Sequence, residues 1–196
     1  MRLGPLNDPT PEQAELAERI ARRRGGVPGP FQVLLRSPRL GGLVEELGSY
    51  CTGAAALPPR LRELALLVAA RRFDAQHSWI AHAGKAADCG IDQAAVRRLA
   101  RGERPDFPDT DDELLYQFAS QVLDSHFVSD EVFAAALGRF GEQGLVDLIG
   151  CLGNFALMAM LLNTFQVDLP PGSQPPFPDV DGFGRRTTSD RNQPLT

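Results

Sequence analysis

Two of the three histidines, His77 and His82, lie five residues apart in the segment 71–90, RRFDAQHSWIAHAGKAADCG, which also holds the single tryptophan. Metal-binding histidine pairs on a helix usually have i, i+4 spacing, which places both imidazoles on one face. On a helix that turns by about 100° per residue, these two side chains point about 140° apart. The spacing argues against a histidine metal site, and we expect neither a metal nor a cofactor.

On the same helical wheel, His82 shares a face with Ser78 and Trp79, which both point within about 60° of it. An imidazole with its ordinary pKa of about 6.5 can exchange a proton at neutral pH. A histidine beside a tryptophan on an apolar helix can equally be a packing residue of the core. Geometry leaves both interpretations open for His82. His126 lies at a predicted helix end, and we interpret it as structural.

Helix start and stop signals recur along the chain and predict the elements that position these residues. Thr10, Pro11 and Gln13 form the pattern of a capping box, which predicts a helix that ends at Gly25. Further starts are predicted at Ser37, at the double proline 58–59, at Thr110 with Glu113 three residues later, and at Ser129. No stretch alternates with period two. The pattern predicts an all-α protein with about eight helices and short connections.

The last predicted helix, from about Glu142 to Phe165, is apolar on nearly all sides and must be buried on most of them. A domain of this size achieves that most easily between subunits, so we expect a homo-oligomer, either a trimer or hexamer or a dimer. Its longest uninterrupted apolar run, FALMAMLL, is too short to cross a bilayer, and we expect no membrane association. We predict one all-α domain over residues 1–168. Residues 169–196 are rich in Pro and Gly and should form an extended tail, either draped over a neighbouring subunit or mobile.

The composition excludes several classes of protein. The net charge of −5 argues against a general nucleic-acid binder, which needs a basic face. The three cysteines are widely spaced and lack a C-x-x-C pair, so neither a disulfide framework nor a zinc site is expected. The first residues contain no apolar segment of the signal-peptide type. We therefore expect a cytoplasmic protein with reduced thiols.

The segment LPPRLRELALLVAARRFDAQHSWIAHAGKAADCGI resembles the central motif of the carboxymuconolactone decarboxylase family, which also contains the alkylhydroperoxidase D-type proteins. That motif has a proline-initiated helix with an Arg-Glu pair. A helix with E-x-x-W-x-x-H follows or, in the peroxidase branch, one with E-x-x-C-x-x-C-x-x-x-H. The flanking segments GPFQVLLRSPRL and LVDLIGCLGNFALMAMLLNTFQVDLP are also similar to the family's, so the resemblance covers residues 29–170. It implies an oligomeric, alkylhydroperoxidase D-like helical bundle.

The resemblance carries over to individual residues. Glu63 matches the family's helix glutamate, His82 the closing histidine, and His77 the intermediate histidine of the peroxidase branch. The two redox cysteines of that branch would fall at Ala75 and Ser78, so both the attacking and the resolving thiol are missing. This loss argues against an alkylhydroperoxidase-like antioxidant protein.

The resemblance implies a cofactor-free carboxy-lyase, or a related enzyme, that acts on a small carboxylated lactone or a ring-cleavage product of aromatic catabolism. Decarboxylation needs a placed proton donor and a site that tolerates negative charge. We expect His82 to exchange the proton and Glu63 to orient its ring. The expected substrate-binding residues are His77, Ser78, Trp79 and Gln76. Gln76 stands where many relatives have glutamate, which leaves open a non-catalytic relative that binds a small acid or serves as a structural module.

Overall fold

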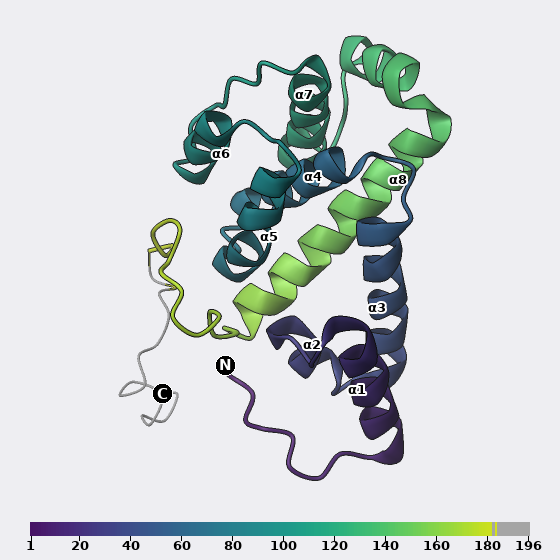
Figure 1. The fold of residues 1–196 in the computed structure, drawn as a ribbon, viewed down its shortest axis with the longest axis vertical. Helices are drawn as coiled ribbons and strands as arrows, with labels where there is room; N and C mark the ends of the chain where they lie inside the picture. Colours follow the sequence, from purple (N-terminus) through teal and green to yellow (C-terminus); the bar gives the residue numbers. More distant parts are fainter. Residues whose placement is uncertain (182, 184–196) are drawn as a thin grey trace.

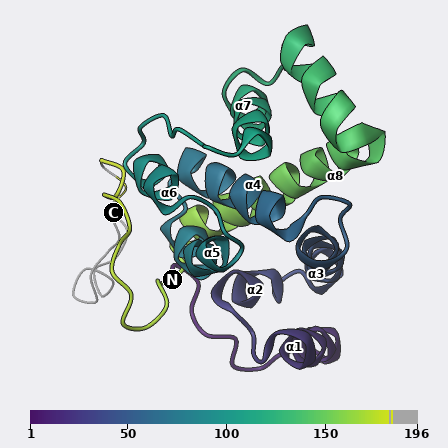
Figure 2. The same cartoon turned by 45° about the horizontal axis from the view of Figure 1, so that its top comes forward.

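The computed structural model describes residues 1–181 and 183, and this part of the chain forms eight helices and no strand. The helices are α1 (Pro11–Arg24), α2 (Gly29–Leu34), α3 (Pro38–Gly53), α4 (Pro59–Arg72), α5 (Gln76–Asp88), α6 (Gln93–Ala100), α7 (Thr110–Ser125) and α8 (Asp130–Thr164). The prediction of an all-α protein is thereby confirmed. Helices α1 to α3 gather at one end of α8 and helices α6 and α7 lie beyond α4 (Figures 1 and 2).

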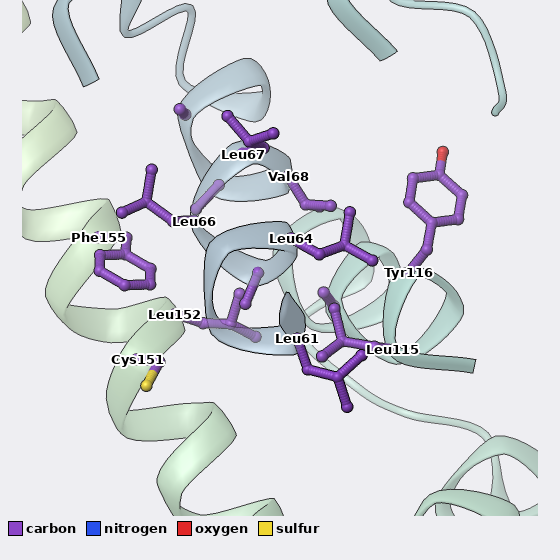
Figure 3. Close-up of a cluster of buried hydrophobic side chains, with 14 of the residues drawn as sticks. Leu61, Leu64, Leu66, Leu67, Val68, Leu115, Tyr116, Cys151, Leu152 and Phe155 are labelled. Atoms are coloured by element: carbon purple, nitrogen blue, oxygen red, sulfur yellow. The ribbon is translucent and has the colours of Figure 1, made fainter. Parts of the chain in front are cut away.

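Helix α4 forms the centre of the fold. Leu61 and every residue from 64 to 70 are buried, and the helix packs against α3, α5, α7 and α8. Figure 3 shows side chains of α7 and of α8 approaching α4 from different sides. Ionisable side chains are rarely fully buried, and the charged residues of α4 accordingly lie outside the segment 64–70, at Arg60, Arg62, Glu63, Arg71 and Arg72.

Most of the predicted helix ends are confirmed, with one shift. The Thr10 hydroxyl accepts from the Gln13 amide, and the Gln13 side chain accepts from the Thr10 amide at 2.9 Å, which is the predicted capping box. The predicted cap at Thr110 is wrong by one residue. Asp109 caps α7 instead, accepting from the amide of Asp111 at 2.9 Å. An ionised carboxylate suits the positive end of the helix dipole better than a hydroxyl does.

Helix α8 contains a break at Gly141, where φ is 71° and ψ is 172°. This left-handed φ is readily adopted only by glycine. The residues after the break form the apolar segment predicted from about Glu142. By length and composition α8 could cross a membrane, but half of its most apolar window is buried inside the fold, as in a core helix.

The chain after α8 packs on its own domain rather than extending away from it. Phe177 is buried, with its ring edge-on to Trp79 at 5.7 Å between centroids. The Arg71 guanidinium lies 4.8 Å from the Phe177 ring centroid. These contacts attach the beginning of the predicted tail to α4 and α5. Residues 182 and 184–196 of that predicted tail lie outside the described residues.

Helices α3 and α8 expose a row of large apolar side chains. The row comprises Leu40, Leu43, Leu47 and Tyr50 of α3 with Val146, Ile149 and Met160 of α8. The Tyr50 hydroxyl donates to the Asp147 carboxylate at 2.8 Å, so the two helices meet directly beside these side chains. We refer to these seven residues as the α3–α8 face. Exposed apolar patches of this kind are typical of interaction surfaces.

A buried ion pair joins the start of α4 to α7. Arg60 Nη1 lies 2.9 Å from carboxylate oxygens of both Asp112 and Asp109, and the Asp112 side chain is only 3% exposed. Burial raises the pKa of Asp112 to about 6 because the lost hydration outweighs the attraction of Arg60. In the folded state this carboxyl therefore holds its proton at a pH where an unfolded chain would have lost it.

We expect the free energy of unfolding to fall as the pH rises from about 4 to about 6, because the buried Asp112 carboxyl loses its proton over this range. The folded state binds more protons than the unfolded state in this window, so the free energy of unfolding falls by roughly 2–3 kcal/mol and then stays level. Asp112→Asn should remove this dependence of the free energy of unfolding on pH. The difference in melting temperature between the wild type and Asp112→Asn should therefore change with pH. Asp8→Asn, at an exposed aspartate, is the control. A constant difference between pH 4 and pH 7 would contradict the prediction.

Candidate active site

The site centres on a hydrogen bond between Glu63 of α4 and His82 of α5. His82 Nδ1 lies 2.8 Å from Glu63 Oε2, and the side chains are 18% and 14% exposed. The predicted contact between the two helices is confirmed. The connection between α4 and α5 is short, so α5 folds back along α4 and brings the middle of one helix to the first turns of the other. An ionised carboxylate can only accept, so the bond places a proton on Nδ1 and leaves Nε2 for proton exchange.

A pocket of about 370 Å³ adjoins this pair. Helix α5 contributes His77, Ser78, Ala81, His82 and Lys85 to its wall. The apolar part of the lining includes Phe31, Val44, Leu66, Phe155 and Met158, and the remaining polar part includes Arg24, Thr52 and Asn154. The volume suits a small organic molecule rather than a polymer.

The helical wheel of α5 explains how both histidines reach one pocket. From His77 to His82 the lining side chains span an arc of about 140°, with Ala81 and Lys85 near its middle. The two imidazoles therefore stand at opposite edges of the pocket wall rather than side by side. This separation fits two different contacts to one ligand and does not fit joint coordination of a metal ion.

Gln76 and Trp79, which we expected to bind substrate, do not line this pocket. Both are buried on the other side of α5, where Trp79 meets the Phe177 ring. Gln76 Nε2 donates to the Phe177 carbonyl oxygen at 2.6 Å. An amide can make this bond and an ionised carboxylate cannot, which gives a structural reason for glutamine at this position.

His77 is held by backbone on both of its sides. Its Nδ1 donates to the Asp168 carbonyl oxygen at 2.8 Å. Across the ring lies Gly29, where an added Cβ would stand 2.9 Å from His77 Cε1 and 2.6 Å from a methyl carbon of Val167. Glycine at position 29 therefore lets α2 approach closely enough to fix the ring. Ser78, by comparison, simply lines the pocket.

The described lining residues carry two cationic side chains, Arg24 and Lys85, and no carboxylate. Such a lining favours an anionic ligand. The sequence interpretation did not identify Arg24 or Asn154 as site residues. Asn154 could have been found, since it is a lone amide within the apolar run LIGCLGNFALMAM. For Arg24 there was no such signal, because a cation in the last turn of a helix is ordinary.

All three cysteines are free, and none of them lines the pocket. Cys51 and Cys151 are buried, and hydrogen bonding to Cys51 together with burial raises the pKa of the Cys151 thiol. Over residues 1–181 and 183, no group of three or more His, Cys, Asp and Glu side chains is placed to hold a metal ion.

Comparison with known proteins adds no assignment. No protein-family model matches the chain. No curated protein matches it significantly in sequence.

We expect Gln76→Glu to destabilise the protein at neutral pH and much less in acid. An ionised glutamate would be buried against the Phe177 carbonyl, at a cost of about 2 kcal/mol or more, whereas a protonated one can donate to it. Burial raises the folded-state pKa of such a glutamate, so the deficit grows as the pH rises above about 4.3. Thermal melts at pH 4.5 and pH 7.5 measure this against the wild type. Gln76→Met is the neutral control and should show a deficit that is independent of pH. An equal deficit at both pH values for Gln76→Glu would contradict the proposed role of the amide.

Proposed function

We propose that this protein is a cofactor-free carboxy-lyase, or a closely related proton-transfer enzyme, acting on a small carboxylated lactone or aromatic ring-cleavage product. The observation that carries the proposal is the Glu63–His82 hydrogen bond at the wall of a pocket with a cationic lining. The sequence resemblance to carboxymuconolactone decarboxylases supports the same reaction class. Removal of carbon dioxide also needs no metal or redox group when the electrons can be delocalised within the substrate.

The proposed reaction begins with the substrate carboxylate losing carbon dioxide. The electron pair of the broken carbon–carbon bond then spreads into the conjugated lactone as an enolate. The imidazolium form of His82 donates its Nε2 proton to carbon, and solvent restores that proton afterwards. The Glu63 carboxylate stabilises the imidazolium through Nδ1 and fixes the direction of Nε2. Lys85, one turn further along α5, lines the same wall and can stabilise the developing negative charge.

A non-catalytic protein that binds a small acid is the second candidate function. The two cationic lining residues, Arg24 and Lys85, favour it, because they would hold an anion whether or not His82 transfers a proton. In that case the Glu63–His82 contact is a buried pair that joins α4 to α5. The two candidates differ in what happens when His82 is removed.

We expect His82→Ala to lower turnover of a carboxymuconolactone-type acid by about 100-fold or more, the usual contribution of a general acid or base. Carbon dioxide release measures turnover, and a thermal melt of the same sample measures stability. Glu63→Gln should retain more activity than His82→Ala because Nε2 is still present. His126→Ala removes an exposed histidine of α7's end and is the matched control.

The binding-only function predicts a different pattern. His82→Ala would then strand the Glu63 carboxylate without its partner and lower stability by roughly 3–5 kcal/mol. A melting temperature that drops this far, together with no turnover by the wild-type protein, would reject the enzymatic proposal.

We also propose that a second copy of the chain covers the α3–α8 face. The exposed side chains there are apolar, and Asp147 at its edge is already satisfied by the Tyr50 hydroxyl and by the Ala56 amide at 2.6 Å. The same surface on another subunit is apolar as well, so the two copies can pack against each other. Two facing copies would shield the large apolar side chains that one chain leaves in water.

We expect sedimentation at micromolar concentration to show a homo-oligomer, and the measured mass distinguishes a dimer from a trimer or a hexamer. Leu43→Glu and Val146→Glu place a charge at side chains that are 62% and 71% exposed, and each should shift the protein toward monomer. Phe127→Glu tests the same change at a side chain that is 79% exposed outside the α3–α8 face, and should leave the mass unchanged. A wild-type monomer would overturn this proposal.

A further inference from the structure

The pocket has a second polar region, on α1, α3 and α8, apart from the α5 wall that carries His82. Its centre is Gly48, a buried glycine of α3. A Cβ at Gly48 would stand 3.7 Å from Arg24 Nη2 and 3.8 Å from both Oδ1 and Nδ2 of Asn154. The three residues all line the pocket. The absent side chain thus leaves a small space between a guanidinium and an amide.

The charges around this space leave one cation uncompensated. Glu45 is fully buried and accepts from Arg23 Nη1 at 2.8 Å and from the Ser49 hydroxyl at 2.9 Å. Arg24 contributes only a longer contact, 3.6 Å from Nη2 to Glu45 Oε1. Two guanidinium groups thus share one carboxylate, which leaves a net charge of +1 beside the pocket. The Arg24 guanidinium also stacks on the Phe31 ring, with Cζ 4.5 Å from the centroid, so its plane is fixed.

Asn154 gives an independent sign of a ligand. The residue is only 4% exposed, and its Oδ1 is buried without a hydrogen-bond partner among the residues that the structure describes. A buried amide that lacks partners costs free energy, so an asparagine kept within an apolar helix needs a compensating interaction. The orphaned atom is an acceptor, so a bound group must bring an O–H or N–H to Oδ1. Its negative charge would be met by the Arg24 guanidinium and by the Asn154 Nδ2 amide, which lies at the same distance from the Gly48 space as Oδ1.

We infer that Arg24 and Asn154 form a carboxylate-binding subsite over Gly48, which anchors the acid group of a small carboxylic acid while His82 faces its reacting atoms. Arginine presents paired N–H donors that match the two oxygens of a carboxylate, and the Asn154 amide adds a further donor. Glycine at position 48 keeps the subsite open. This inference rests on the proposed function for the reaction, but the binding it describes does not require turnover.

Gly48→Ala tests the subsite with the smallest possible change. The new methyl group meets its neighbours at ordinary contact distances, and alanine favours a helix more than glycine does, so the fold should be kept or stabilised. The methyl group nevertheless occupies the space proposed for the carboxylate. Gly53→Ala, on the same helix and with nothing within 4 Å of its Cβ, is the matched control.

The probe is benzoate, with benzamide as its uncharged counterpart, and titration calorimetry measures both. The wild-type protein should bind benzoate at least tenfold more tightly than benzamide. Gly48→Ala and Arg24→Lys should each weaken benzoate binding about tenfold or more, and Gly53→Ala should not. Equal binding of the two probes by the wild type, or unchanged benzoate binding by Gly48→Ala, would overturn the inference.

These outcomes are separate from those that test the reaction. Benzoate binding that depends on Gly48 and Arg24, in a protein without lyase activity, would support the subsite and reject the proposed enzyme. Lyase activity with a KM unchanged in Gly48→Ala and Arg24→Lys would support the enzyme and reject the subsite.

Discussion

The burial of α4 on all sides is the constraint on which the rest of the structure depends. Seven consecutive residues, from Leu64 to Ala70, have almost no contact with solvent, so each neighbouring helix must present an apolar face to them (Figure 3). A carboxylate next to such a segment needs a partner. Glu63 stands directly before it, and α5 supplies His82 as that partner. The site and the core are thus built on the same helix, and the tight packing of α4 in the core holds Glu63 of the site in place.

The helices could be predicted from local signals in the sequence. The Glu63–His82 contact was predicted from the resemblance to a known motif together with the short connection between α4 and α5. Prolines and capping residues mark the helix starts, and a short connection forces α4 and α5 into a hairpin. The cap of α7 was placed one residue late, since Asp109 and Thr110 are both good capping residues and only the backbone conformation decides between them.

The composition of the pocket could not be predicted in the same way. Which face of α5 meets the pocket depends on Phe177, about a hundred residues away, which covers the opposite face and takes up Gln76 and Trp79. A helical wheel gives relative angles but no direction in space. Arg24 and Asn154 likewise reach the pocket only through the packing of α1 and α8 around α3, and their spacing in the sequence carries no trace of it.

The break at Gly141 has a consequence for how the molecule opens. Residues before it lie beside α7, whereas residues after it cross the core against α4 (Figures 1 and 2). Because the helical hydrogen-bond ladder is interrupted there, fraying of the first part need not propagate into the second. Amide protons of α8 before Gly141 would then exchange with solvent in a local opening. Amide protons of α4 and of α8 after Gly141 would exchange only when the whole domain unfolds. The break at Gly141 therefore separates local opening of α7 and the first part of α8 from the site.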